Sequence, residues 1–282
     1  MNFSESLAPT KTDNNPFVIG LPITTPRQFF GREQILKRIF DVWRSPPLQH
    51  IGIIGVKRSG KTSLLHYLSR IIDTPSKDLR PNQRNDWIKP LNQWVYIDFQ
   101  DARMCYQESL LQHILSKIGL PTPQPCDLFA FTDIIDQYLD IPTIILLDEI
   151  KMGFDSPDLD DNFWWGMRSL GCGGKLGYVL TAHKAPEDML QDDGQPSPFF
   201  NIFGHLLNLN PFTEDEALDF ISSIPQIFDK KDIEWIINKS AKWPFLLQMI
   251  CHSRFTALKE GQKDNAWKLE ALQAIKRYRY LL

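Results

Sequence analysis

Residues 50–65 read HIGIIGVKRSGKTSLL, an apolar run followed by a turn between two glycines and by the start of a leucine-rich segment. The turn, residues 55–62, matches the pattern G-x-x-x-x-G-K-[ST] of a phosphate-binding loop. In such a loop consecutive backbone N–H groups point at phosphate oxygens, and glycine supplies the backbone freedom that this geometry needs. The stretch therefore predicts a strand, a loop that binds a nucleoside triphosphate, and a helix, in that order.

Two side chains at the end of the loop carry specific chemistry. Lys61 places a positive charge on the β- and γ-phosphates, and the hydroxyl of Thr62 joins the coordination shell of Mg²⁺. The helix that begins here adds the positive end of its dipole. We expect the nucleotide to contact the whole loop, which comprises Gly55, Val56, Lys57, Arg58, Ser59, Gly60, Lys61, Thr62 and Ser63.

A second motif, IILLDE, occupies residues 144–149. Four apolar residues lead into Asp148 and Glu149, which places both carboxylates at the carboxyl end of a buried strand, where α/β sheets bind ligands. Asp148 is expected to orient Mg²⁺ through water. Glu149 is expected to polarise the water that attacks the γ-phosphate.

Short apolar runs alternate with helical patterns over most of the chain, which predicts an α/β fold with a parallel five-stranded sheet in a three-layer core. The expected strands are 50–55, 93–99, 142–148, 175–181 and 205–209. The expected helices between them are 61–73, 107–118 and 127–139.

After Pro211 the pattern becomes entirely helical, over 213–224, 229–240, 244–260 and 265–280. Thr213 and Glu216 form a capping-box pattern at the start of the first of these helices. We therefore expect a disordered lead at 1–14, a P-loop core at 15–210 and a small C-terminal all-helical lid at 211–282.

Polar residues end two further strands. Asp98 ends the strand that lies between the two motifs in the sequence, either as a strand-end acid or as part of the site. The strand at 175–181 leads into Thr181 and then His183, and its end is expected between those of the first and third strands. Thr181 is the first candidate and His183 the second for contact with the γ-phosphate or the attacking water.

Composition and charge limit the partners and the location that we expect for the protein. The 282 residues carry a formal net charge of −3, so a nucleic-acid partner would have to be held by a local basic patch. The four cysteines show no CxxC spacing. No apolar run approaches the roughly 18 residues that span a bilayer, and the N-terminus lacks a secretory pattern. No membrane contact and a cytoplasmic location are the expectation.

The order of these motifs resembles that of the AAA-type ATPases, closest to the branch of origin-recognition-like and STAND ATPases. Residues 29–33, FFGRE, resemble the box on the adenine side, residues 209–217 the turn that opens the lid, and residues 243–248, WPFLLQ, the lid motif. The resemblance implies ATP as the nucleotide, with Gly31, Arg32 and Pro244 on the nucleoside side.

The same resemblance does not decide which arginine acts at the nucleotide. The lid motif has Lys242 in place of its usual glycine and contains no arginine, and Arg254 follows one helical stretch later. Arg168 is the candidate for an arginine finger offered to a neighbouring subunit.

Three functions fit this sequence. The first is an ATP-hydrolysing switch whose nucleotide state controls self-assembly, as a homo-oligomer, or contact with a separate effector protein in signalling or defence. The second is a DNA-linked ATPase that assembles on duplex DNA, as loaders and transposition regulators do. The third is an interaction module that binds nucleotide without hydrolysing it, against which Glu149 argues.

Overall fold

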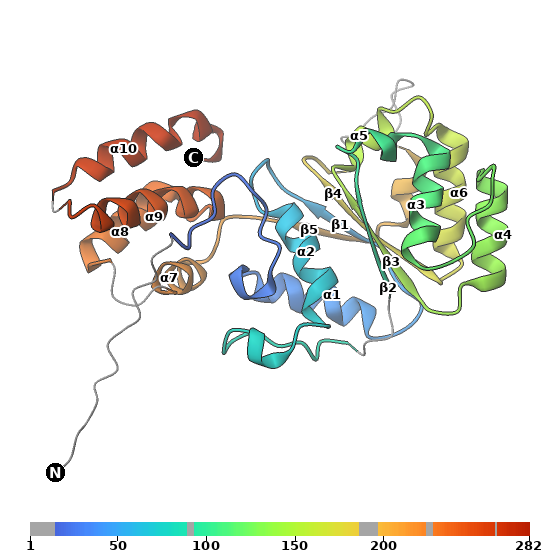
Figure 1. Cartoon of the computed structure of the whole chain (residues 1–282), viewed down its shortest axis with the longest axis horizontal. Helices are drawn as coiled ribbons and strands as arrows, with labels where there is room; N and C mark the ends of the chain where they lie inside the picture. Colours follow the sequence, from blue (N-terminus) through green and yellow to red (C-terminus); the bar gives the residue numbers. More distant parts are fainter. Residues whose placement is uncertain (1–14, 89–92, 186–196, 224–227, 263) are drawn as a thin grey trace, which may run out of the picture.

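Five parallel strands form one sheet in the order β2-β3-β4-β1-β5 (Figure 1). The structure is a computed structural model, and it describes residues 15–88, 93–185, 197–223, 228–262 and 264–282. The strands are β1 (Ile51–Ile54), β2 (Gln93–Asp98), β3 (Thr143–Asp148), β4 (Leu176–Ala182) and β5 (His205–Asn208). All five predicted strands and the parallel sheet are thus confirmed. The lead expected at 1–14 lies outside the described residues.

Helices cover both faces of the sheet, so the predicted three-layer α/β fold is confirmed. On one face lie α1 (Glu33–Trp43) and α2 (Lys61–Ile71), which pack in a core cluster with β1. The other face carries α3 (Gln107–Lys117), α4 (Leu128–Tyr138), α5 (Ile150–Phe154) and α6 (Asp161–Cys172). Short 3-10 turns complete the core at Pro26–Gln28, Ser76–Asp78, Ala102–Cys105 and Pro198–Ile202.

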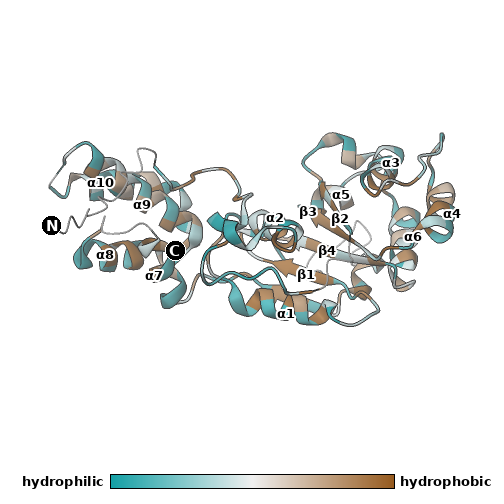
Figure 2. Ribbon diagram, turned by 60° about the horizontal axis from the view of Figure 1, so that its bottom comes forward, coloured by the Kyte–Doolittle hydropathy of each residue, from teal (hydrophilic) through white to brown (hydrophobic). Residues whose placement is uncertain are grey.

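The position of β4 decides the geometry of the site. It lies between β1 and β3, and all seven of its residues are buried. Figure 2 shows the strands as the apolar centre of this part of the molecule. The carboxyl ends of β1, β4 and β3 therefore bring the phosphate loop, His183 and the acidic pair side by side, as expected from the sequence.

The C-terminal helices form a separate cluster beside the sheet (Figure 1). They are α7 (Glu214–Ser222), α8 (Lys230–Ser240), α9 (Pro244–Lys259) and α10 (Ala266–Ile275), followed by the 3-10 turn η6 (Lys276–Leu281). The predicted capping box is present, because Glu216 N–H donates to the Thr213 hydroxyl and Thr213 N–H to the Glu216 carboxylate. Phe17 also packs into this cluster, which we call the lid and which therefore includes a segment from outside 211–282. In the described residues, no helix has the length and apolar character needed to cross a membrane.

Candidate nucleotide site

The phosphate loop joins β1 directly to α2. Gly60 caps α2 with φ of 98°, a left-handed conformation that glycine adopts without strain. At Gly55 an added Cβ would lie 2.6 Å from the Ser59 hydroxyl, so the loop closes tightly only without a side chain there. Arg58 also has a positive φ, of 70°. The loop thus has the compact turn that the sequence motif predicts.

Lys61 points back into its own loop. Its ammonium group donates to the carbonyl oxygens of Gly55, at 2.9 Å, and Val56, at 3.2 Å. A third contact joins it to Nδ1 of His183 at 3.2 Å. Burial lowers the pKa of this lysine, although the neighbouring carboxylates of Glu149 and Asp148 oppose the shift. The ammonium group that would meet a γ-phosphate is thus held by two neutral carbonyl oxygens, which are weaker acceptors than a charged phosphate.

Asp148 is fixed from both sides. Its Oδ1 accepts from the Thr181 hydroxyl at 2.5 Å, and its Oδ2 accepts from the Tyr96 hydroxyl at 2.9 Å. Thr181 also accepts from the backbone N–H of Glu149 at 3.0 Å and is completely buried. Burial and the Asp148 charge raise the pKa of Tyr96, so this phenol remains a donor. Thr181 thus positions the acidic pair from beneath.

His183 is the side chain at the end of β4 that links the two motifs. Its Nε2 lies 3.1 Å from Glu149 Oε2, and its Nδ1 faces the Lys61 ammonium. Because an ammonium group can only donate, Nδ1 accepts and the ring proton sits on Nε2, which donates to the carboxylate. His183 thus contacts both Glu149 and Lys61, and contact of Thr181 or His183 with the γ-phosphate or the attacking water stays a prediction.

A cleft of about 480 Å³ opens above the phosphate loop and the acidic pair. The phosphate loop and the pair Asp148 and Glu149 line its floor, together with Thr62 and Asp98. The lid contributes Pro244, Phe245 and Gln248, and residues 18–23 contribute a third wall. Asp98 thus reaches the cleft, while its Oδ1 accepts from Gln100 N–H at 2.9 Å. Pro244 and Gln248 also line a smaller annex of about 60 Å³.

Residues 15–24, which we call the strap, connect the lid with the core across this cleft. Asn15 donates to the His252 carbonyl, and Val18 N–H donates to the Gln248 side chain at 3.0 Å. At the other end Ile23 N–H donates to the Ser63 hydroxyl at 3.0 Å.

Arg58 ties the phosphate loop to both the strap and the lid. Its guanidinium donates to the Gly20 carbonyl at 3.1 Å and lies over the Phe245 ring at 4.8 Å. This residue thus connects the phosphate loop directly with the lid.

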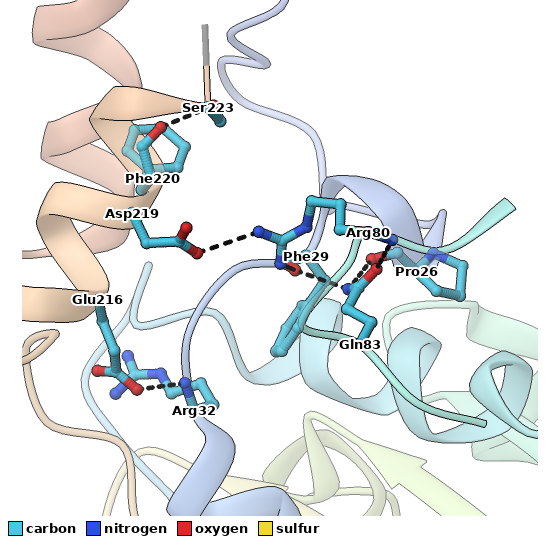
Figure 3. A network of polar contacts seen from close by, with 9 residues as sticks. All are labelled: Pro26, Phe29, Arg32, Arg80, Gln83, Glu216, Asp219, Phe220 and Ser223. Carbon is cyan, nitrogen blue, oxygen red and sulfur yellow. Dashed lines mark hydrogen bonds and ion pairs between the residues drawn. The ribbon is translucent and has the colours of Figure 1, made fainter. Parts of the chain in front are cut away.

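Gly31 and Arg32 lie at the junction of core and lid. Arg32 is buried, and its guanidinium donates to the carbonyl oxygens of Asn210 and Ser59. Its backbone N–H donates to Glu216 at the start of α7 (Figure 3). A Cβ added at Gly31 would meet that same carboxylate. Burial lowers the pKa of Arg32 to about 10, so it stays charged. Both residues join the phosphate loop to the lid, and their contact with a nucleoside remains a prediction.

A second junction lies beside the first and was not foreseen from the sequence. Arg80 donates to Asp219 of α7 at 3.1 Å and to the Phe29 carbonyl at 2.6 Å (Figure 3). Gln83 donates to the Pro26 carbonyl at 2.6 Å. Nothing in the local sequence around Arg80 marks this role, because its partner in the lid is 139 residues away.

The two candidate arginines lie away from the cleft. Arg168 on α6 stacks on Trp165 at 5.1 Å, and its role as a finger toward another subunit stays a prediction. Arg254 pairs with buried Asp232 at 2.6 Å and lies over Trp267 at 5.1 Å. It faces the interior of the lid and is not the surface residue that its sequence position allowed.

Together the fold and the cleft have the form expected of a phosphate-loop core beside a helical lid. Solved structures agree: the Walker-type ATPase of Pyrococcus abyssi has a TM-score of 0.63 at 17% identity, over 94% of this chain and 77% of that one. Orc1 of Aeropyrum pernix, solved with DNA, has a TM-score of 0.60 at 14% identity, over 88% of this chain and 66% of that one. AMPPCP-bound DnaA of Aquifex aeolicus has a TM-score of 0.55 at 15% identity, over 92% of this chain and 70% of that one. No protein-family model and no curated protein matches the chain. At these identities the likeness establishes the fold.

Proposed function

We propose that the protein binds ATP with Mg²⁺, hydrolyses it, and uses the nucleotide to set the angle between lid and core. The observation that carries this proposal is the cleft that joins the phosphate loop and Glu149 to lid residues Pro244 and Gln248, with His183 in contact with both Lys61 and Glu149. Support for the nucleotide comes from DnaA, whose solved structure contains AMPPCP. The division into a core at 15–210 and a lid at 211–282 belongs to the same proposal, with the strap bridging the two.

The residues of this chain suit the steps of phosphoryl transfer to water. The ammonium group of Lys61 leaves the loop carbonyls for the γ-phosphate, because a charged phosphate is the stronger acceptor. Glu149 then orients the attacking water and accepts its proton, while His183 keeps the carboxylate in place through Nε2–H. Removal of the side chain of Glu149 or of His183 should therefore lower turnover more than nucleotide binding.

Thr62 and Asp148 suit Mg²⁺, which favours oxygen ligands and retains several waters. Asp148 already accepts two hydroxyl bonds, so its remaining lone pairs would reach the ion through water. The metal would neutralise charge on the phosphates as the bond to the leaving group breaks.

Lid movement follows from where the nucleotide sits. The strap, the phosphate loop and α9 all line the same cleft, so a ligand there contacts each of them. Ligand binding favours the lid angle that makes the most contacts, and hydrolysis removes part of that preference.

ATP hydrolysis by the wild type, Lys61→Ala and Glu149→Gln, with the mass of each sample measured in parallel, tests the proposal. We expect Lys61→Ala to lose nucleotide binding, and Glu149→Gln to bind without turnover and accumulate as a larger assembly. His183→Asn keeps a polar side chain and should lower turnover more than binding. Wild-type turnover by Glu149→Gln would refute the catalytic assignment. Bound nucleotide with no turnover in the wild type would favour the non-hydrolysing module.

DNA is the coupling partner that the comparisons favour, and we propose that it is duplex DNA. Orc1 of Aeropyrum pernix was solved in complex with DNA, and the structural likeness spans 88% of the present chain. The net charge of −3 means that a DNA complex would depend on a local patch, with binding that weakens steeply as salt rises. Fluorescence anisotropy with a labelled duplex, measured with and without ATP over a salt series, separates the alternatives. ATP-dependent binding that salt abolishes supports DNA, and its absence returns the proposal to a separate effector protein.

A further inference from the structure

Arg58 bridges the three walls of the nucleotide cleft on its solvent side. Its side chain is exposed, and its guanidinium donates to the Gly20 carbonyl of the strap at 3.1 Å. The same guanidinium lies 4.8 Å from the centre of the Phe245 ring on the lid. Arg58, Gly20 and Phe245 all line the cleft. In the described part of the chain no carboxylate forms an ion pair with Arg58, so two neutral groups hold its charge across the entrance.

The backbone on both sides of this bridge adopts conformations that side chains other than glycine rarely take. Arg58 has a φ of 70°. Ala241 and Lys242, which come shortly before α9 begins at Pro244, have φ of 45° and 62°. Such left-handed residues cost free energy and persist where the surrounding contacts hold them. These turns set the positions from which Arg58 and Phe245 approach each other.

A second ring extends the bridge into the lid. Tyr278, in the turn η6, contacts Phe245 edge-to-face with 4.7 Å between the ring centres. Arg277 lies over the Tyr278 ring at 5.6 Å. Figure 1 shows η6 on the side of the lid that faces the core. We call this continuous row of contacts the latch, and it consists of Tyr278, Phe245, Arg58 and Gly20.

We propose that the latch controls the release of nucleotide, and that η6 is the part of the lid through which release is regulated. The inference rests on the proposed function, because it takes the ligand of the cleft to be a nucleotide. While Arg58 contacts both Gly20 and Phe245, the entrance stays closed over bound ATP or ADP. Tyr278 lies outside the lining of the cleft and acts through Phe245, which makes it a positioning residue. A partner that displaces Tyr278 therefore frees Arg58 and speeds release.

Each contact of the latch is weak by itself, which suits a part that must open in every cycle. The row contains one cation over a ring, one edge-to-face ring pair and one hydrogen bond to a neutral carbonyl. Loss of the contact between Tyr278 and Phe245 should speed release by about two- to tenfold. Loss of Arg58 removes two contacts at once and should speed release by about five- to fiftyfold.

Release of fluorescent mant-ADP and mant-AMPPCP into an excess of unlabelled nucleotide, followed by stopped flow, tests the latch. Tyr278→Leu should release both faster, while the rate constant for hydrolysis of bound ATP in a single turnover stays at the wild-type value. Tyr278→Phe keeps the ring and should restore wild-type release. Tyr280→Leu removes the exposed tyrosine of the same turn, whose ring lies 6.4 Å from that of Tyr278, and is the matched control. Thermal melts check that each variant is folded.

A double variant separates the latch from the charge of Arg58. Arg58→Gln should speed release, and Arg58→Gln with Tyr278→Leu should be no faster than Arg58→Gln alone, because Tyr278 acts only through Arg58. Fully additive effects would overturn the inference, and so would wild-type release by Tyr278→Leu or equally fast release by Tyr280→Leu. Each of these results leaves the proposed function in place. A wild type that binds neither labelled nucleotide would refute the proposed function and the latch together.

Discussion

Replacement of Thr181 by valine removes one buried hydroxyl beside the acidic pair and so tests its contribution alone. The side chain is completely buried, and valine keeps its branched shape. The change removes the bond donated to Asp148, at 2.5 Å, and the acceptor of the Glu149 N–H, at 3.0 Å. Among the described residues, the Asp148 carboxylate then keeps one side-chain hydrogen bond, from the Tyr96 hydroxyl.

The size of the effect follows from these two bonds. A hydrogen bond to a charged group contributes about 1.5–3 kcal/mol, and an unsatisfied buried N–H costs about 1–3 kcal/mol. Water from the adjoining cleft can replace part of this loss, so we expect about 3 kcal/mol of destabilisation. In a chain of this size that corresponds to a fall in Tm of roughly 6–12 °C.

Thr181→Val should also lower the affinity for Mg²⁺. Residues that orient a metal ligand typically alter metal affinity by about 10- to 100-fold when they are lost. A titration of ATPase rate against Mg²⁺ should therefore shift to higher concentration by that factor in Thr181→Val. Thr181→Ser keeps the hydroxyl and serves as the control. If Thr181→Val keeps both the wild-type melting temperature and the wild-type Mg²⁺ midpoint, the positioning role of Thr181 is wrong.

Three further changes test other parts of the structure. Glu216→Ala removes the bonds from Thr213 N–H and Arg32 N–H, and should lower the free energy of unfolding in urea by about 1–2 kcal/mol. The pKa of His50 is lowered to about 4, mainly by burial, so between pH 6.5 and 4 the unfolded chain binds more protons than the folded one. Stability should therefore fall as pH falls through this range, by about 3 kcal/mol in total, and His50→Gln should remove that part of the slope in melts at several pH values. Alanine substitutions at Arg80 and Asp219 should show a coupling of about 0.2–1 kcal/mol in a double-mutant cycle, because the pair is partly exposed, and added salt should reduce it.

The sheet could be predicted because its strands carry their own signal. β3 and β4 are buried at every position and read as apolar runs between turns, so burial on both faces leaves a pattern in the sequence itself. The phosphate loop was equally visible, since Gly55 and Gly60 are needed for local backbone reasons.

The roles of polar side chains could not be ranked in the same way. Thr181 and His183 are separated by one residue, and only the placement of β4 against β3 shows which faces Asp148 and which faces Lys61. Arg254 poses the same difficulty, because its partner Asp232 lies on another helix of the lid. Such contacts depend on packing between elements, and single-sequence patterns contain no information on it.

The strap sets a mechanical limit on the lid. Val18 is fastened to α9 and Ile23 to α2, so only five residue steps of backbone separate the two anchors. Fully extended, such a segment reaches at most about 17 Å. The lid can therefore move away from the core only as far as this short segment allows while both anchors hold, and a wider opening requires that one of the two hydrogen bonds break. Glycine–serine insertions between residues 19 and 22 would lengthen the connection between the two anchors stepwise, and the range of lid motion should increase with each insertion.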